Sequence, residues 1–360
     1  MGIKAWATTN NTVWTTSNGT VVTSLVDADN PEGLRPYTIR FKFDDASYNP
    51  TNESWTPGSF WVQVSSSPNV WDFTYADSYW PSIFSNRFQD RNNLVHILGA
   101  NLIGVDSMTW TFNGCTALRS VAEMDLSTVH GLYKLFSGCD ALNSITRLNT
   151  ASATSMEEMF RDCTSLTTVP LFDTSNVTNM TGMFSGCSSL TTVPLFNTAS
   201  VQNMHSMFYE CTSLTAVPLF DTSEVTTMYR MFCNCRSLAT VPLFNTTNVT
   251  SMNEMFDRCV SLTTAPLFDT SRAIEMQGMF SDSGLTAVPL YNTVNAANVS
   301  NMFSQCRNVE SGALALYQQM SSQAVVPGSH SLCFSGCGSD TVTGRAELAQ
   351  IPTSWGGTMA

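Results

Sequence analysis

A phrase of 24 residues recurs along most of this 360-residue chain. It reads Met-Phe-x-x-Cys-x-x-Leu-x-x-Val-Pro-Leu-Phe-Asp/Asn-Thr, continues with Val-x-x-Met, and then returns to Met-Phe. A fixed period in this range is typical of a solenoid, in which each unit covers the apolar face of the next unit. Seven cysteines mark the period at steps of 24 residues: Cys115, Cys139, Cys163, Cys187, Cys211, Cys235 and Cys259.

The first element expected within each coil is a parallel β-strand. Leu166-x-x-Val169-x-Leu171 has the spacing of the strand in leucine-rich repeats. Because side chains alternate along a strand, we expect Val169 and Leu171 to face inward. Pro170 and its equivalents lie inside this strand and remove one N–H donor from each coil, so we expect the sheet to be narrow at that height.

The second expected element is a short helical turn that returns the chain to the next strand. Met180, Met183 and Phe184 have the i, i+3, i+4 spacing of one helix face. The fold class is therefore a repeat solenoid, leucine-rich-repeat-like, with one parallel strand and one short helical turn per coil. The phenylalanines of the turn are predicted to be deeply buried, each stacked between its own copies: Phe184, Phe208, Phe232 and Phe256.

The extent of the repeat divides the chain into three regions. Residues 1–85 do not repeat and are predicted to form a small β-rich domain for attachment or oligomerisation. Residues 86–309 are predicted to form a solenoid of about nine coils. Residues 310–360 are predicted to form a C-terminal cap, because the terminal unit of a solenoid has one side in water.

Local patterns predict the elements of the two end regions. Alternating apolar and polar residues indicate strands at 37–43 and 60–64. Helical spacing at 309–323 and a short apolar pattern at 346–351 indicate two helices in the cap.

Charge and composition argue against two classes of partner. The net charge is −12 with 16 basic residues, so the basic footprint of a nucleic-acid-binding protein is absent. No apolar run approaches the length of a membrane span. The first residues lack the apolar core of a signal peptide, which predicts folding in a cytosol.

The segment Asn-Val-Thr-Asn-Met-Thr-Gly-Met-Phe-Ser-Gly-Cys-Ser-Ser-Leu at 176–190 recurs in register over about 94–306. This pattern resembles the BspA-like leucine-rich-repeat family. The resemblance implies a right-handed solenoid. It also implies a bacterial surface protein or adhesin, or a related repeat protein of phages of gut bacteria, and such proteins are not enzymes as a class. The family supplies no catalytic residue to carry over, and we expect no cofactor.

The cysteine column is predicted to line the interior of the solenoid in the reduced state. An odd total of 11 cysteines and one cysteine per coil argue against a disulfide framework. Metal sites need clustered ligands, which single cysteines 24 residues apart do not provide, so we expect no metal. This structural column includes Cys163, Cys187, Cys211, Cys235 and Cys259.

A second aromatic column follows the leucine of the Val-Pro-Leu-Phe segment. If the strand continues through it, the rings point outward and form a candidate binding surface that stacks on sugars. If the chain turns there, the rings belong to the core, and the rarity of large exposed aromatic patches favours this alternative. The column contains Phe172, Phe196, Phe220, Phe244, Phe268 and Tyr291.

The position after this aromatic residue alternates between Asp and Asn over nine coils. An uninterrupted Asp column would stack like charges about 4.8 Å apart. Asn can donate to a carboxylate in the neighbouring coil, and Asp can also cap its own turn through the residue two positions on. We therefore predict a continuous Asp–Asn hydrogen-bonded ladder without calcium, which includes Asp173, Asn197, Asp221 and Asn245.

These patterns predict a non-enzymatic structural or adhesion protein, most simply a surface or fibre component of a phage virion. Residues 1–85 would contact other virion proteins or a second copy in a homo-oligomer, and the solenoid would present a surface to a host glycan or protein. The alternatives are a bacterial cell-surface adhesin and a polysaccharide-cleaving fibre enzyme. The four histidines share no spacing and no nucleophile motif is present, so the enzyme alternative has no catalytic constellation in the sequence.

Overall fold

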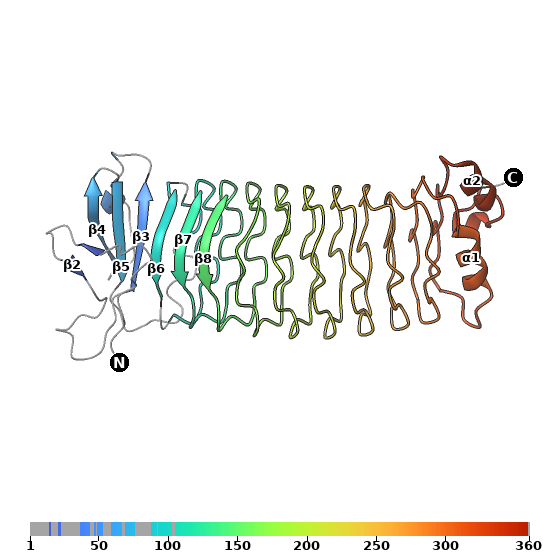
Figure 1. The fold of residues 1–360 in the computed structure, drawn as a ribbon, viewed down its shortest axis with the longest axis horizontal. Coiled ribbons are helices and arrows are strands. Elements are labelled where there is room, and N and C mark those ends of the chain that lie inside the picture. The colour runs from blue at the N-terminus through green and yellow to red at the C-terminus, as the bar shows by residue number, and fades with distance from the viewer. Residues whose placement is uncertain are drawn as a thin grey trace. The chain divides into compact units, whose positions relative to one another are not determined.

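The structure is a computed structural model, which divides into two compact units, Met1–Ala153 and Thr154–Ala360 (Figure 1). The boundary predicted between residues 85 and 86 lies inside the first unit, because β3 (Tyr37–Phe43) pairs directly with β6 (His96–Asn101), the strand of the first coil. The described residues are 14–15, 21–22, 37–43, 47, 49–52, 59–66, 69–75, 88–91, 93–102 and 105–358.

The first unit contains a six-stranded sheet in the order β4-β5-β3-β6-β7-β8. The strands β4 (Ser59–Ser66), β5 (Asn69–Tyr75), β3 and β6 pair in antiparallel fashion. The strands β7 (Ser120–Asp125) and β8 (Ser144–Asn149) follow parallel to β6. The sheet of the N-terminal segment therefore continues into the strands of the coils.

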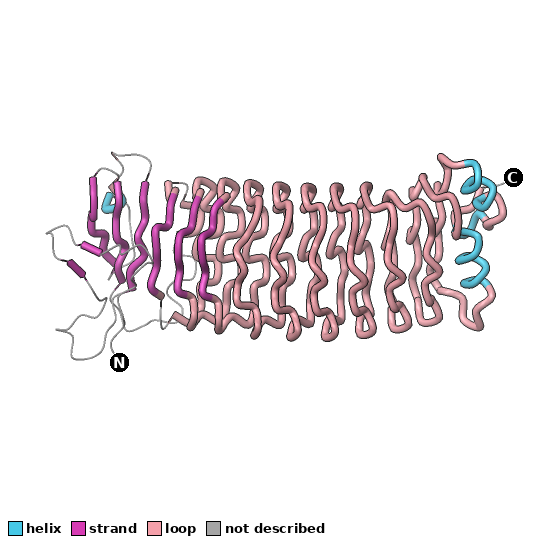
Figure 2. The backbone as a smooth tube through the Cα atoms, in the orientation of Figure 1, coloured by secondary structure: helices cyan, strands magenta, loops and turns pink. Residues whose placement is uncertain are grey.

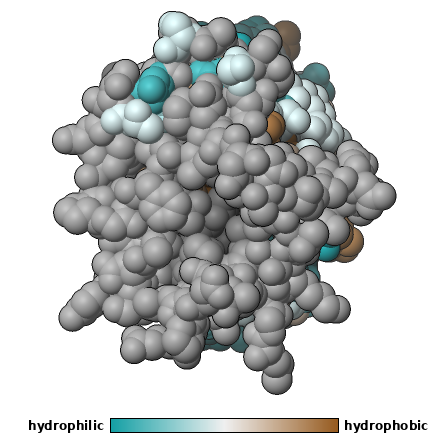
Figure 3. Space-filling model, turned by 90° about the vertical axis from the view of Figure 1, so that its left-hand side faces the viewer, coloured by the Kyte–Doolittle hydropathy of each residue, from teal (hydrophilic) through white to brown (hydrophobic). Residues whose placement is uncertain are grey.

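The strands predicted at 37–43 and 60–64 are confirmed as β3 and β4. Two short elements precede or interrupt them: the antiparallel pair β1 (Trp14–Thr15) and β2 (Val21–Val22), and the 3-10 helix η1 (Pro50–Asn52). Much of the attachment domain predicted at 1–85 lies outside the described residues, so its attachment role stays a prediction. On the side shown in Figure 3, the visible described residues are of mixed hydropathy.

Phenylalanines stack on one another in the coils of the first unit. The ring centroids of Phe88 and Phe112 lie 5.3 Å apart, and those of Phe112 and Phe136 lie 5.5 Å apart, with nearly parallel planes. Phe41 of β3 packs against Phe88 at 5.1 Å, so the N-terminal sheet closes one end of this stack. Among the described residues, the repeated stack therefore begins at Phe88.

In the second unit the coils stack on one another without any β-strand among the described residues, as the pink loops of Figure 2 show. Hydrogen bonds along the Met-Phe turn hold neighbouring coils together. The N–H groups of Met180, Gly182, Phe184 and Gly186 donate to carbonyls of the next coil at 2.7–3.0 Å. Two of the intervening N–H groups, those of Met183 and Ser185, donate to the carbonyls three residues back in their own coil. We call this pattern the turn ladder.

The predicted helical turn is wrong. Gly182 and Gly186 have positive φ angles of 58° and 75°, and their equivalents in the other coils do too. Left-handed residues at every fourth position prevent a right-handed helix and turn alternate N–H groups toward the next coil.

The predicted inward orientation of Leu171 is also wrong, because Leu171 is 65% exposed whereas Val169 is buried as expected. The cause is visible in later coils, where the Phe220 N–H donates to the Pro218 carbonyl at 3.0 Å. This i→i+2 bond closes a γ-turn with the leucine at its apex. The turn breaks the alternation of a strand, so the leucine points out and the following aromatic residue points in.

The aromatic column that begins at Phe172 is therefore core, and its interpretation as a binding surface is wrong. Phe172 is 2% exposed, and its ring stacks on Phe196 at 5.8 Å. The turn phenylalanines form a second stack, with Phe184 and Phe208 5.7 Å apart. Rings of the two stacks also face each other, as Phe184 and Phe196 do at 6.1 Å. The predicted burial and self-stacking of Phe184, Phe208, Phe232 and Phe256 are confirmed.

The cysteine column lies in the interior, as predicted. The Sγ atoms of Cys187, Cys211, Cys235 and Cys259 donate to phenylalanine carbonyls 27 residues earlier, at 3.0–3.1 Å. Burial raises the pKa of each of these thiols. The thiols therefore act as buried donors, a role that the repeat alone did not indicate, and their reduced state in solution stays a prediction.

The continuous Asp–Asn ladder predicted along one edge is wrong in the second unit. The Oδ1 atoms of Asp221 and Asn245 each accept the N–H two residues on, at 3.0 and 3.2 Å, and close local turns. Neither Asn197 nor Asn245 donates to a neighbouring carboxylate among the described residues. One rung of the predicted type occurs in the first unit, where Asn149 Nδ2 donates to Asp125 at 3.0 Å.

The second unit ends in the predicted cap. The helix α1 (Ala313–Ser321) buries Ala313, Leu316 and Met320. The helix α2 (Val342–Leu348) begins before the predicted 346–351, because Thr341 caps it by accepting the Gly344 N–H at 2.9 Å. A last 3-10 helix, η2 (Thr353–Trp355), follows. None of the helices in the described part of the chain is long and apolar enough to cross a membrane.

Candidate functional site

Variation between the coils of the second unit is concentrated at four positions of the turn. The interior positions repeat nearly the same residue, because each interior side chain stacks on its own copy; outside the turn, the exposed or half-buried position after the cysteine also varies. At these four positions the coils starting at 174, 198, 222 and 246 differ completely. We call these positions the turn face; they are Thr181-Gly182 with Ser185-Gly186, His205-Ser206 with Tyr209-Glu210, Tyr229-Arg230 with Cys233-Asn234, and Asn253-Glu254 with Asp257-Arg258.

Backbone geometry does not account for the large side chains on the turn face. Ser206, Arg230 and Glu254 have φ angles of 52–54°, in the left-handed region. A side chain costs about 1–2 kcal/mol there relative to glycine. Gly182 and Gly278 occupy the same position in other coils, so the fold accepts glycine. The larger residues are therefore retained at a conformational cost, which points to a role outside folding.

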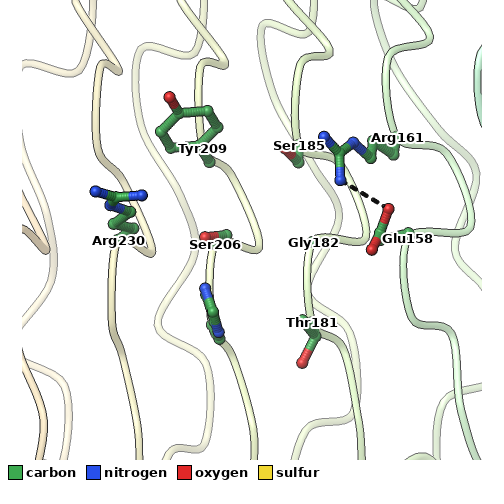
Figure 4. Close-up of a pocket in the computed structure, with 9 residues that line it drawn as sticks. Glu158, Arg161, Thr181, Gly182, Ser185, Ser206, Tyr209 and Arg230 are labelled. Atoms are coloured by element: carbon green, nitrogen blue, oxygen red, sulfur yellow. Dashed lines mark hydrogen bonds and ion pairs between the residues drawn. The ribbon is translucent and has the colours of Figure 1, made fainter.

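A polar notch of about 320 Å³ opens on the turn face of the second unit (Figure 4). Its floor is the coil of Gly182 and Ser185, whose side chains are small. Its walls are Glu158 and Arg161 of the preceding coil and Tyr209 of the following coil. The notch exists because one coil with small turn residues lies between two coils with large ones.

The charged groups of the notch are paired. Arg161 donates to Glu158 Oε2 at 2.9 Å, and this bond raises the pKa of Arg161. On the other side, Arg230 Nε donates to Glu254 at 2.7 Å, and its guanidinium lies 5.0 Å from the centre of the Tyr229 ring. Each guanidinium keeps further N–H groups beyond these bonds, which are available to a ligand.

Two uncharged rings complete the lining. Burial, with the positive charge of Arg230 as a second cause, lowers the pKa of His205, so the imidazole is neutral at neutral pH. The His205 ring lies 4.7 Å from that of Tyr229. A hydrogen bond with Glu210 raises the pKa of Tyr209, which keeps the phenol protonated. The notch thus offers aromatic surface beside neutral and charge-assisted hydrogen-bonding groups.

This combination fits a compact ligand rich in hydroxyl groups. Guanidinium N–H groups donate, Glu158 accepts, and Ser185 and Ser206 can do both. The volume is at the lower end of the range of ligand pockets, about 300–1,000 Å³. Of the described residues that line the notch, Glu158 alone is a carboxylate. Glycoside hydrolysis needs two carboxyl groups that flank the scissile bond, so the lining favours binding over cleavage.

A thiol and two carboxylates converge elsewhere on the turn face. The ligand atoms of Cys233, Glu254 and Asp257 lie within 4.8 Å of one another. These groups already satisfy each other: the Cys233 thiol lies 3.6 Å from Asp257, and Arg230 holds Glu254. Burial raises the pKa of Cys233 to about 12, which opposes the thiolate that a metal needs. The expectation that the chain binds no metal stays a prediction.

None of the residue columns predicted from the sequence lines the notch, although His205, one of the four histidines, does. The Cys163 and Phe184 columns are interior, and Phe172 reaches only the floor of a separate shallow groove with Leu171 and Leu195. The repeat directs attention to what stays the same, whereas the notch is made by what differs. A coil-by-coil comparison of side-chain size would have identified Gly182 between its larger neighbours.

Comparison with known proteins gives one family and several structures. The family model described as "Mycoplasma protein of unknown function, DUF285" matches residues 106–217 and 214–317. No curated protein matches the sequence.

The similar solved structures are bacterial leucine-rich repeat proteins, as the sequence resemblance implies. The protein from T. pallidum is 24% identical, with 46% of this chain and 82% of that chain covered and a TM-score of 0.36. The protein from Eubacterium ventriosum is 16% identical, with coverage of 57% and 88% and a TM-score of 0.27. The protein from Bacteroides ovatus is 14% identical, with coverage of 77% and 87% and a TM-score of 0.24.

Proposed function

We propose that this chain, which belongs to the DUF285 family, is a non-enzymatic adhesion protein. The family assignment rests on the family model, which matches more than half of the sequence. The turn face of the chain binds a hydroxyl-rich surface ligand, with the notch at Gly182 as the binding site. The ligand class is a glycan, which fits the pairing of an aromatic wall with hydroxyl-directed donors and acceptors.

The observation that carries this proposal is the contrast between a constant interior and a variable turn face. Side chains that stack on their own copies cannot change without loss of packing. The turn face has no such constraint, yet it carries aromatic rings, and it carries the ion-paired Arg230 and Glu254 at left-handed positions where glycine is accepted. A repeat protein with these properties provides a regular scaffold on which a specific surface is built.

The location of this adhesion follows the sequence interpretation. We place the protein on the surface or a fibre of a phage virion, with a bacterial cell surface as the alternative. Mass spectrometry of purified virions and protease treatment of intact cells distinguish the two locations. Detection in virions supports the first location, and release of turn-face peptides from intact cells supports the second.

Binding is tested with purified capsule and cell-wall polysaccharides immobilised on a sensor. The variant Gly182→Arg fills the notch with a residue that Arg230 shows to be tolerated at this left-handed position. We expect it to lose binding at least tenfold, and Tyr209→Ser, which copies Ser185, to lose binding to a smaller extent. Gly278→Arg makes the same change four coils away and is the matched control.

Two outcomes contradict the proposal. Equal loss in Gly182→Arg and Gly278→Arg would place the effect in folding and not in the notch. Release of reducing sugars by the wild-type protein, abolished by Glu158→Gln, would replace adhesion by hydrolysis.

A further inference from the structure

A row of leucines is exposed along the second unit. Each leucine follows the proline of its coil, in a segment that is separate in sequence from the turn face. Their exposed fractions lie between 52% and 65%. In the later coils each leucine stands at the apex of the γ-turn, so its side chain is directed outward by the backbone. We call this row the leucine column; it contains Leu171, Leu195, Leu219, Leu243, Leu267 and Leu290.

The leucine column is confined to the second unit. In the first unit the equivalent positions are Glu123 in β7 and Arg147 in β8, which face each other in the register of the sheet. Charged residues therefore suit this position when it is solvated. Six exposed leucines in a row are a contiguous apolar patch, and such patches mark interaction surfaces.

The Asp/Asn positions lie beside the leucine column. A shallow groove of about 380 Å³ is lined by Leu171 and Leu195 together with Asp173 and Asn197. The Oδ1 atoms of Asn197, Asn245 and Asn292 accept local N–H groups. Their Nδ2 groups donate to no atom of the described residues, so these donors face solvent beside the leucines.

We propose that the leucine column is the interface with a second copy of this chain, packed antiparallel. The six positions beside the leucines read Asp, Asn, Asp, Asn, Asp, Asn from 173 to 292. When this series is read backwards, each Asp coincides with an Asn of the forward series, and each Asn coincides with an Asp. In an antiparallel pair about a two-fold axis between the coils of Asp221 and Asn245, every Asp of one copy therefore faces an Asn of the other.

Pitch and area favour this occupant over others. The coils of the two copies have the same spacing, so the leucines of one copy stay level with those of the other along the whole row. A helix repeats about every 5.4 Å, whereas the ring centroids of Phe220 and Phe244, which follow two of the leucines, lie 6.5 Å apart, so a helix drifts out of register over six coils. Roughly 100 Å² per leucine gives about 600 Å² per copy and about 1,200 Å² for a pair, which reaches the lower limit of specific interfaces.

A parallel pair does not bring the Asp/Asn positions of the two copies together. Its two-fold axis runs along the row of coils, so the Asp/Asn positions of the two copies lie on opposite sides of the joined leucine columns. The Asn donors then gain no partner from the other copy. Asp–Asn pairs therefore form only in the antiparallel arrangement, and this gives a role to the Asp/Asn pattern that the intramolecular ladder did not fulfil.

The first test measures the mass of the full-length protein by analytical ultracentrifugation over a range of concentrations. We expect a monomer–dimer equilibrium in the wild type and a shift of at least tenfold toward monomer in the double variant Leu219→Ser/Leu243→Ser. The control Val260→Ser/Ile274→Ser replaces two other exposed apolar residues of the same unit and keeps the dimer. A wild type that is monomeric at all concentrations overturns the proposal, as does a dimer that the leucine variant leaves unchanged.

The second test determines direction by oxidative cross-linking. All 11 native cysteines are buried, so introduced thiols dominate the reaction. In the antiparallel pair Leu171 faces Leu290 of the other copy. A mixture of Leu171→Cys and Leu290→Cys proteins should cross-link, whereas either protein alone should not. Cross-linking of Leu171→Cys with itself contradicts the antiparallel arrangement and indicates a parallel pair.

The third test uses charge. Asn197→Asp with Asn245→Asp places carboxylates opposite carboxylates and should weaken the dimer most at low salt. Asp221→Asn with Asp269→Asn, combined with the first pair, again places an Asn of one copy opposite every Asp of the other and should recover the dimer. Failure of this rescue, with the fold intact by circular dichroism, would remove the charge argument.

Discussion

The coils of the first unit and those of the second unit share one phrase but differ in how the Val-x-x-aromatic segment is used. In β6–β8 the segment is a hydrogen-bonded parallel strand. In the second unit it forms no strand among the described residues. The position that holds Pro170 and its equivalents in the second unit holds Ala122 and Thr146 in the first, and the aromatic position two residues later holds Met124 and Leu148, so the strand form lacks both the proline and the second ring.

The turn ladder is common to both units. Trp110 N–H donates to the Tyr133 carbonyl at 2.9 Å in the first unit, as Gly182 does to His205 at 2.8 Å in the second. The strand ladder is therefore an addition, and the turn ladder with the aromatic stack is the constant element. The proline gives up strand hydrogen bonds, and the γ-turn that replaces them moves a second aromatic ring into the core.

Alkaline unfolding should separate the two units most strongly. Thiols with raised pKa values in the folded state stabilise it fully below the unfolded pKa of about 8.5, and this stability is lost as pH rises toward the folded pKa. The second unit has eight such cysteines, at 187, 211, 233, 235, 259, 306, 333 and 337. The loss approaches about 1.4 kcal/mol per thiol for each pH unit above 8.5.

The measurement is urea unfolding at pH 8 and pH 10 with pulsed thiol alkylation, read by peptide mass spectrometry. Labels should enter the second unit at lower urea at pH 10, with a smaller shift at Cys115 and Cys139. Equal shifts in both units would show that the buried thiols are not the cause. Cys211→Ser, which keeps a donor, should reduce the shift by the share of one thiol.

Removal of one stacked ring should damage the second unit locally. Phe208→Ala deletes a fully buried ring between Phe184 and Phe232 and should cost about 3–5 kcal/mol. Because each coil contacts only its neighbours, hydrogen exchange should rise mainly in adjacent coils. A uniform rise along the chain would contradict nearest-neighbour stacking. Leu219→Ala, at an exposed position of the same coil, is the control and should be nearly neutral in the monomer.

Reciprocal proline substitutions test whether the strand ladder is dispensable. Ala122→Pro places a proline in β7, between β6 and β8, and should cost about 1–3 kcal/mol through unpaired backbone groups. Pro218→Ala removes a proline from a coil without a strand and should change stability by less than about 1 kcal/mol. Denaturant midpoints of the two variants give the comparison. Equal costs would mean that the proline is needed where it occurs.

A buried hydroxyl supports the strand-free coils. Thr222 Oγ1 donates to the Asn245 carbonyl of the next coil at 2.7 Å, and Thr222 is 1% exposed. Thr222→Val should cost about 1 kcal/mol in thermal or urea unfolding. Thr215→Val is the matched control, because its hydroxyl bond of 3.4 Å is exposed. A control as costly as the test would assign the effect to β-branched packing.

The smallest expected effect is local titration. Hydrogen bonds from Ser223 lower the pKa of Asp221. A lowered folded-state pKa stabilises the fold above the unfolded pKa, and this contribution is lost as pH falls through the folded value. Ser223→Ala should raise the pKa of Asp221, measured by NMR titration, with little change in stability because the group is exposed. The Asp173 titration should not move.

The features predicted correctly from the sequence are mainly those that recur in every coil. The period, the buried cysteines and the stack of Phe184 copies follow from one residue type at one spacing, and β3 follows from its alternation. The outward direction of the leucines was not predicted because, in the later coils, an i→i+2 bond reverses their direction without changing the spacing. The helical turn failed because left-handed residues there are often not glycine. The notch was not predicted because it arises from a difference between coils, which a search for repeated residues does not detect.

Because the interior layers are uniform, one coil can take the place of another without a change in the core packing. Segments 174–197 and 222–245 present the same Met, Phe, Cys and Leu layers to their neighbours and both end in Asn. Exchange of the two would keep every interior layer and the Asp/Asn series, while the coil of Gly182 would move and carry the notch with it. Recombination between the segments that encode similar coils would therefore move the notch along the turn face in one step, without a single new point mutation.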